Sequence, residues 1–188
     1  SERNILGFIP FRHFQFKGIK KVLTDSQAGC RYLKNKYPEY ENKIGCKYMG
    51  VKSVGENPFR ADFIFTIVSC SSLISLKRIH LIAEALHYCD FPLHWIHIGD
   101  GPLKNTLLPM FKDYPDHIKI IFTGFITKEE MIRIYSHYPI HLFLHVSESE
   151  GLPVSIMEAA SYGIPLMACN VGGVPEIVTD KTGILMKP

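Results

Sequence analysis

The chain has 188 residues, a length that allows one hydrophobic core or slightly more. Its hydrophobic content of 46%, its charged content of 21% and its formal net charge of +3 are typical of a soluble globular protein. No basic run is longer than Lys20-Lys21, which disfavours a dedicated nucleic-acid-binding protein. No apolar run approaches the ~18 residues of a membrane-spanning helix, and no signal peptide is visible.

The five cysteines indicate free thiols rather than disulfides. Their number is odd and they form no C-x-x-C pair, so buried free thiols in a reducing cytoplasm are expected. The histidine spacing does not favour a metal site. His141 and His145 would share one face of a strand but lie ~13 Å apart, whereas His94 and His97 would point to opposite faces. We therefore expect no metal.

The first 60 residues predict a partial α/β unit followed by a linker. No clear element is predicted for residues 1–17. The expected elements are, in chain order, a strand at 19–24, a helix ending near 36 and a strand at 43–48. Asp25 or Ser26 caps the helix, and Pro38 stops it. The polar segment 52–60 is typical of an interdomain linker.

From residue 61 onward, strands alternate with helices. The predicted strands are 63–69, 93–98, 118–122, 139–146, 164–168 and 184–186. The predicted helices are 77–88, 103–112 with a break at Pro109, 128–137 and 153–162, with a helical turn at 174–178. Thr127 and Glu130 form a capping box for the third helix. Because the strands are apolar on both faces, this alternation predicts a Rossmann-like domain with a parallel sheet between helices.

The stretch EGLPVSIMEA, residues 150–159, carries two carboxylates eight positions apart at the junction of a strand and a helix. Pro153 is expected at the first helical position, and Gly163 as the C-terminal cap. A helix N-terminus that faces the carboxyl ends of strands binds anions, and carboxylates beside it accept hydrogen bonds from sugar or ribose hydroxyls. An ordinary surface turn with two solvated glutamates explains the spacing alone equally well.

This stretch resembles the E-x7-E signature of the GT4 family of retaining glycosyltransferases, in the EGLP variant followed by M-E-A. The segment GGVPE at 172–176 belongs to the same pattern, and LTDSQAGCRYL at 23–33 is similar to the last strand and helix of the family's N-terminal domain. The resemblance implies the GT-B fold. Residues 1–51 would be a remnant of the N-terminal acceptor-side domain, 52–60 the linker, and 61–188 the C-terminal nucleotide-sugar-binding domain, truncated at its C-terminus.

The resemblance also implies how a donor diphosphate is bound. Lys77 corresponds to the family's diphosphate-binding lysine, although its spacing alone favours a solvated lysine at a helix start. Ser72 stands five positions earlier, where the family often has an arginine. Hydroxyl groups or Arg78 would replace the missing charge.

Two turns are expected to shape the nucleotide cleft. The turn at 99–102 matches the family's Gly-x-Gly-Pro, which makes Gly101 a candidate for the cleft floor. Gly124 and Phe125 match a turn whose backbone meets the nucleobase, since amides offer fixed donors and acceptors. Plain strand-to-helix turns explain both segments as well.

In the family pattern, Glu150 lies near the hydroxyls of the transferred sugar, and Glu158 accepts hydrogen bonds from the ribose. Gly151 and the amides of Leu152 and Val154 would complete the donor site. The two glutamates are not a hydrolase dyad, which would place both carboxyls across one glycosidic bond. Lys77 and Glu150 are therefore the expected catalytic residues, with Lys77 and a helix terminus stabilising the leaving diphosphate without a metal.

The sequence thus predicts the donor-binding half of a glycosyltransferase that uses a UDP- or GDP-sugar. The acceptor would be a glycan or a lipid-linked molecule, the configuration would be retained, and the pathway would be surface polysaccharide biosynthesis. The expected location is the cytoplasm, with peripheral membrane association through the missing N-terminal domain. The fragment is expected to be inactive alone. A non-catalytic nucleotide-sugar-binding module, which Ser72 favours, and an epimerase of the same fold remain alternatives.

Overall fold

The computed structural model of the chain describes residues 12–53, 55–61, 64–111 and 114–188. These residues form two compact units, one up to Met49 and one from Gly50 onward. Each unit has its own sheet and its own hydrophobic core. They are described separately.

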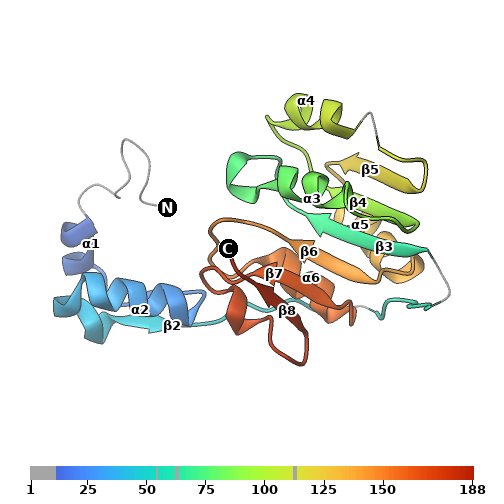
Figure 1. The fold of residues 1–188 in the computed structure, drawn as a ribbon. Coiled ribbons are helices and arrows are strands. Elements are labelled where there is room, and N and C mark those ends of the chain that lie inside the picture. Colours follow the sequence, from blue (N-terminus) through green and yellow to red (C-terminus); the bar gives the residue numbers. More distant parts are fainter. Residues whose placement is uncertain (1–11, 54, 62–63, 112–113) are drawn as a thin grey trace. The chain divides into compact units, whose positions relative to one another are not determined.

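The first unit is a small α/β structure (Figure 1). Its elements are α1 Arg12–Gly18, β1 Val22–Thr24, α2 Gln27–Lys36, a 3-10 helix Pro38–Lys43 and β2 Ile44–Cys46. The two strands pair in parallel, and both are shorter than predicted. Ser26 caps α2 as expected, accepting a hydrogen bond from the Gly29 amide at 3.2 Å. Helix α1 was not predicted; Phe16, on α1, is buried against Cys30 and Ile44.

The second unit contains a six-stranded, entirely parallel sheet in the order β5-β4-β3-β6-β7-β8 (Figure 1). The strands are β3 Phe65–Cys70, β4 Leu93–Ile98, β5 Ile118–Gly124, β6 Leu142–His145, β7 Leu166–Cys169 and β8 Gly183–Met186. The predicted Rossmann-like α/β fold is confirmed. From β3 the chain builds outward to β5 and then returns to the other side of β3. The strand order therefore reverses between β3 and β6, where doubly wound sheets bind their ligands.

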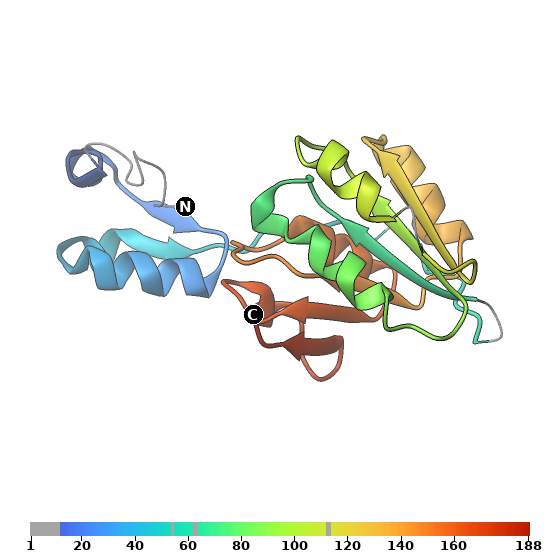
Figure 2. The same ribbon diagram turned by 45° about the horizontal axis from the view of Figure 1, so that its top comes forward.

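Helices cover both faces of this sheet (Figure 2). They are α3 Ile79–Leu86, α4 Lys104–Leu107, α5 Lys128–His137 and α6 Val154–Ser161, with 3-10 turns at Ser75–Lys77, Leu108–Phe111 and Val174–Glu176. Helices α3 and α4 pack in one hydrophobic cluster with Ile67 and Trp95, and α5 and α6 pack in the other with Val68 and Ile96. The alternation of strand residues between the two clusters is the period of two that a buried strand requires.

Two predicted helices differ from the observed ones. The helix expected from residue 77 begins at Ile79, because Lys77 ends a 3-10 turn and Arg78 adopts a left-handed backbone with φ 48°. The helix expected from 103 contains four α-helical residues and then continues as a 3-10 turn. Pro109 lies in that turn, where its missing N–H ends the α-helical hydrogen bonds.

The segment predicted as a linker belongs to the second unit and makes several hydrogen bonds to the rest of it. The side-chain amide of Asn57 donates to the carbonyls of Tyr135 and Tyr138 at 2.7 and 2.9 Å, and its oxygen accepts from the Ile140 amide at 3.0 Å. The Ser53 hydroxyl donates to the Ser161 carbonyl at 3.1 Å. The segment is thereby tied to the C-terminal ends of α5 and α6.

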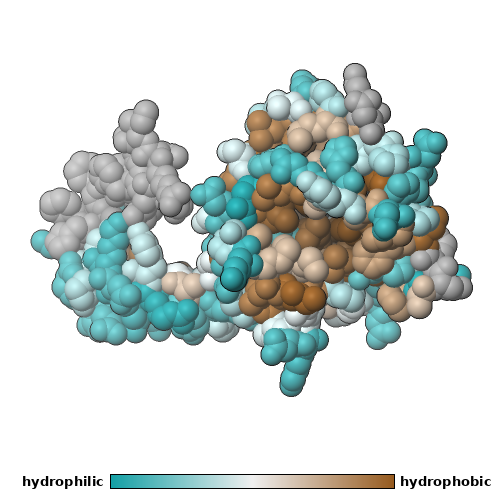
Figure 3. All heavy atoms as spheres, viewed as in Figure 1, coloured by the Kyte–Doolittle hydropathy of each residue, from teal (hydrophilic) through white to brown (hydrophobic). Residues whose placement is uncertain are grey.

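Hydrophobic side chains gather over the middle of the second unit on the face shown in Figure 3, with hydrophilic side chains around them. The exposed hydrophobic residues of this unit include Leu76, Val154 and Ile184. Among the residues that the structure describes, no helix combines the length and apolar character needed to cross a membrane. All five cysteines are free thiols, but only Cys30 and Cys169 are buried as predicted, and the other three are partly exposed.

Candidate functional site

A hollow of about 630 Å³ lies at the carboxyl ends of the strands in the second unit. Residues that follow β3, β4, β5 and β6 line it, together with the first residues of α5 and α6. Most of the predicted donor-site residues meet here: Ser72, Lys77, Gly124, Phe125, Glu150, Leu152, Val154 and Glu158. The hollow is thus at the reversal of strand order, where the fold predicts a ligand site.

An ion pair joins the two sides of this reversal. The Lys77 ammonium, which follows β3, lies 2.5 Å from Glu150 Oε1, which follows β6. The two side chains are 21% and 11% exposed, so the pair is largely removed from solvent. Two residues that are 73 positions apart in the sequence are therefore direct partners in the hollow.

His145 and Ser147 complete the surroundings of Glu150. His145 Nε2 lies 2.9 Å from Glu150 Oε1 and 3.1 Å from the Ser147 hydroxyl. Because a carboxylate can only accept, we assign a hydrogen to Nε2, donated to Glu150. Burial raises the pKa of Glu150, but hydrogen bonds from His145, Lys77 and Ser147 outweigh it and lower the pKa to about 2. Glu150 is therefore ionised at neutral pH.

Sequence reasoning missed both of these partners. It weighed His145 only as a metal ligand, and it did not consider Ser147. The available signal was their position at the end of a buried strand, within five residues of Glu150. His141, the other histidine on this strand's face, instead accepts from the Thr66 amide at 3.0 Å and contacts the Arg60 carbonyl at 2.9 Å. It has a structural role.

Arg78 does not line the hollow. Its guanidinium donates to the carbonyls of Val146 and Ser147 at 2.8 and 3.4 Å and lies 3.3 Å from the sulfur of Cys169. Arg78 thus anchors the loop that carries Glu150. Lys128, the first residue of α5, lines the hollow instead and brings a second positive side chain that the sequence analysis did not name.

The glycine turn after β4, Gly99 to Gly101, packs against the loop that follows β3. Gly99 lines the hollow and has φ 136°, and a Cβ there would lie 2.0 Å from the Ser71 carbonyl oxygen. Gly101 does not line it, and its Cβ would lie 2.7 Å from the backbone of Leu73. Both positions require glycine because two loops approach each other by their backbones.

The turn after β5 forms one rim. Gly124 has φ 72°, which favours glycine, and the Phe125 side chain is 80% exposed where it lines the hollow. Thr127 then caps α5 in the predicted capping box, with Glu130 accepting from the Thr127 amide at 2.7 Å.

The N-terminus of α6 forms another part of the lining of the hollow. Pro153 is extended, with φ −71° and ψ 116°, so it is the capping residue rather than the first helical residue that the sequence predicted. No side chain caps this helix, and Leu152, Val154 and Ser155 line the hollow. The first amides of α6 thus remain available to an anion.

The loop before α6 is held by the glycine pair of the GGVPE segment. Gly151 does not line the hollow, and its carbonyl accepts from the Gly173 amide at 2.8 Å. Gly172 has φ 53°, and a Cβ there would lie 1.8 Å from the Glu150 carbonyl oxygen. The pair therefore supports the backbone of Glu150 from outside the hollow.

Glu158 lies within α6 and faces the same hollow. Burial raises the pKa of its carboxyl, and the charge of Lys128 acts in the opposite direction. Its carboxylate makes no hydrogen bond to any residue in the described ranges, which leaves its oxygens free to accept from a ligand. Within the same ranges, no three His, Cys, Asp or Glu residues are placed to hold a metal ion.

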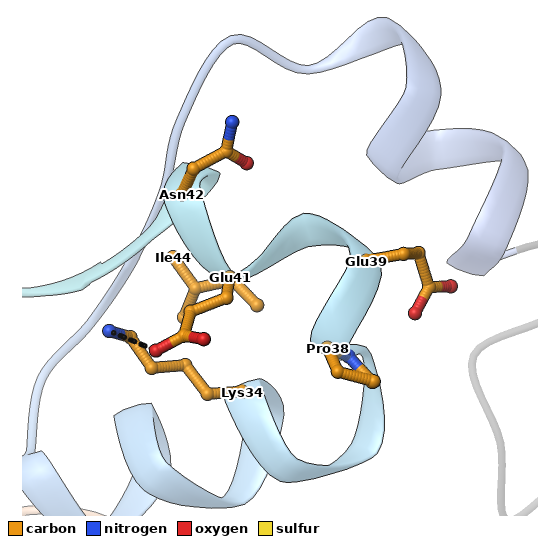
Figure 4. Close-up of a pocket in the computed structure, with 6 residues that line it drawn as sticks. All are labelled: Lys34, Pro38, Glu39, Glu41, Asn42 and Ile44. Atoms are coloured by element: carbon orange, nitrogen blue, oxygen red, sulfur yellow. Dashed lines mark hydrogen bonds and ion pairs between the residues drawn. The ribbon is translucent and has the colours of Figure 1, made fainter.

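A second hollow, in the first unit, lacks these features (Figure 4). Lys34 pairs with Glu41 at 3.3 Å, and their side chains are 35% and 64% exposed. Glu39 points away from that pair in Figure 4. An exposed ion pair of this kind contributes little, and we assign no role to this hollow.

The fold and the hollow of the second unit define a domain of the GT-B glycosyltransferase type. A six-stranded parallel sheet places a lysine and two glutamates of the E-x7-E pattern at its switch point. Residues 61–188 match the family model described as glycosyl transferases group 1. The chain belongs to this family.

Three known proteins illustrate the relationship. The putative colanic acid biosynthesis glycosyltransferase WcaL of Escherichia coli is 28% identical over 155 residues, which span 77% of this chain and 38% of WcaL. A sulfoquinovosyl transferase of Arabidopsis thaliana is 37% identical over 95 residues, 48% of this chain and 18% of the relative. HepE of Anabaena, solved with UDP and glucose, superposes with a TM-score of 0.71 at 21% identity, covering 90% of this chain and 50% of HepE. The chain thus spans half or less of each.

Proposed function

We propose that the chain is the donor-binding part of a glycosyltransferase that takes a sugar from a UDP- or GDP-sugar. The acceptor is a glycan or a lipid-linked molecule, the configuration is retained, and the pathway is surface polysaccharide biosynthesis. The observation that carries the proposal is the meeting of Lys77, Glu150 and Glu158 in one hollow at the switch point of the sheet. The relationship to WcaL supports the pathway, and the likeness to HepE supports a nucleotide-sugar donor.

In this proposal the diphosphate is bound by side-chain charge and by backbone amides. Lys77 leaves Glu150 for the phosphate oxygens, and the uncapped N-terminus of α6 adds its amides. Lys128 supplies the second cation in place of the arginine that Ser72 replaces. These groups stabilise the charge that develops on the leaving diphosphate, which is the role a metal ion has in other transferases.

The carboxylates recognise hydroxyl groups. Glu150 is ionised, with a pKa of about 2, and it accepts from the hydroxyls of the transferred sugar while His145 keeps it in place. Glu158 accepts from the ribose hydroxyls. Gly124 and Phe125 meet the base at the rim.

We further propose that this chain alone binds the donor without transferring the sugar. In the GT-B fold the active site lies between two domains. Residues 1–51 belong to the acceptor-side domain, with 52–60 as the linker and 61–188 as the donor domain. The fuller protein would act in the cytoplasm, with its N-terminal domain at the inner face of the plasma membrane.

The test is a calorimetric titration of the chain with UDP, GDP and ADP. We expect one of these nucleotides to bind, and Lys77→Ala or Glu158→Ala to weaken it by about 1–3 kcal/mol, the usual cost of losing a charged hydrogen bond. Lys34→Ala, in the first unit, is the control and should leave the affinity unchanged. A folded wild-type chain that binds neither UDP nor GDP would contradict the proposal, whether or not it binds ADP.

A further inference from the structure

Two tyrosines between α5 and α6 bury their hydroxyl groups without a partner. The side chains of Tyr135 and Tyr162 are 0% and 3% exposed, and their rings meet edge to face with centroids 5.4 Å apart. Neither hydroxyl makes a hydrogen bond to the part of the chain that the structure describes. Buried hydroxyls in native proteins are almost always hydrogen-bonded, to protein or to an internal water. This pair therefore points to a bound group.

Neither tyrosine lines the hollow, but each lies one helical turn behind a residue that does. Tyr162, the residue that caps the C-terminus of α6, follows Glu158 by four positions, so the two side chains lie on one side of the helix. Tyr135 follows Met131 by four positions in α5, and Met131 lines the hollow. The tyrosine hydroxyls are thus placed behind the wall that presents Glu158.

The pKa shifts of the two tyrosines are consistent with their lying near Glu158. Burial is the main cause of the raised pKa of both tyrosines, and the negative charge of Glu158 adds to it in each case. Other titratable groups near this cluster are Cys70 of β3, whose pKa burial raises to about 11, Lys77, whose charge acts against that rise, and Lys128 of α5. Neither tyrosine ionises near neutral pH, so both remain hydrogen-bond donors.

We propose that Tyr135 and Tyr162 are positioning residues for Glu158. Their hydroxyls donate to one buried water, and the water donates to the inner oxygen of the Glu158 carboxylate. Three of the four hydrogen bonds of that water are then used, which is usual for an internal water. The outer carboxylate oxygen is held toward the hollow, where it accepts from the ribose. This last step rests on the proposed function; the hydrogen-bonded cluster does not.

The first experiment reads the cluster without any ligand. The pKa of Glu158 is measured by carbon NMR of its carboxyl in the wild type and in Tyr135→Phe and Tyr162→Phe. Hydrogen bonds to the charged form lower a carboxyl pKa, so losing them should raise the pKa of Glu158 by about half a unit in each variant. The control is Tyr138→Phe, because Tyr138 is 56% exposed at the end of α5. An unchanged pKa in both variants overturns the inference.

The second experiment asks whether the cluster serves the ribose. Both variants should bind the nucleoside diphosphate identified in the titration about fivefold more weakly than the wild type does. Its 2′,3′-dideoxy analogue, which lacks the ribose hydroxyls, should bind equally to the wild type and to both variants. Equal losses for both nucleotides would mean that the tyrosines act on the fold alone. If the wild type binds no nucleotide, the proposed function fails and the ribose role with it, whereas the titration of Glu158 still decides the cluster.

Discussion

Glu150 receives hydrogen bonds from residues that follow two different strands. Lys77 reaches it from the end of β3, and His145 and Ser147 from the end of β6. The combined effect is a pKa of about 2, compared with the ordinary value of 4.5. Because folding favours the ionised form of Glu150, the protonation of this carboxyl is linked to the stability of the second unit.

That linkage has a definite pH dependence. The folded pKa of Glu150 lies below the unfolded value, so its ionised form stabilises the fold fully above about pH 4.5 and loses this effect as the pH falls toward 2. We expect Glu150→Gln to lower the free energy of unfolding by about 2 kcal/mol at pH 7. The difference from the wild type should shrink below pH 4.5 in urea unfolding. A difference in unfolding free energy between the wild type and Glu150→Gln that is constant from pH 7 to pH 3 would contradict this linkage.

Gly172 offers a test of the backbone that carries Glu150. Gly172→Ala adds a Cβ that would lie 1.8 Å from the Glu150 carbonyl oxygen, at a φ of 53°. The loop must shift, and we expect a loss of about 2–4 kcal/mol in unfolding free energy together with weaker nucleotide binding. The matched control is Gly163→Ala, where φ is 73° but nothing lies within 4 Å of the Cβ. Gly163→Ala should lower the unfolding free energy by about 1 kcal/mol, because only the left-handed backbone disfavours the new side chain.

At the scale of elements, the sequence predicted best those helices and strands whose bounds are set by neighbouring residues. Helix α5 was predicted with its observed bounds because its capping box is local, and β4 because its apolar run is sharply bounded. The predicted start of α3 was wrong because no neighbouring residue indicates the left-handed backbone of Arg78. The guanidinium of Arg78 instead bonds to a loop that is far away in sequence. His145 and Ser147 were missed although they lie within five residues of Glu150, because the sequence does not show that their side chains turn toward its carboxylate.

The segment before β3 behaves as part of the second unit. Asn57 donates to the carbonyls of Tyr135 and Tyr138 and accepts from the Ile140 amide. Removing its side-chain amide leaves these two acceptors and one donor without their partner. We expect Asn57→Ala to lower the unfolding free energy of this unit by about 2–3 kcal/mol. Asn105→Ala, at an exposed position in α4, should change it little. Equal effects of the two substitutions in chemical denaturation would show that the segment is not anchored.

At the scale of the whole molecule, the two units differ in the size of their cores. In the described residues, the buried core of the first unit consists of Phe16, Cys30 and Ile44, whereas the second unit has two extensive clusters. A core of that size contributes little stabilisation. The units should therefore unfold separately, with the first unit less stable.

The single tryptophan makes this measurable. Trp95 is fully buried in the second unit, so its fluorescence reports that unit alone, while far-ultraviolet circular dichroism reports both. With increasing urea we expect part of the dichroism to be lost before the fluorescence changes. Coincident transitions would mean that the units unfold as one.

The Lys77–Glu150 pair has a consequence for turnover. Any phosphate that binds at Lys77 must compete with a carboxylate that is already in place at 2.5 Å. The protein thus contains its own competitor at this position, and because the competition is intramolecular it does not depend on the concentration of dissolved anions. In the proposed function, such a competitor weakens binding of the donor and of the product alike, and it recaptures the lysine as soon as the nucleoside diphosphate begins to leave. A site built in this way exchanges affinity for rapid release.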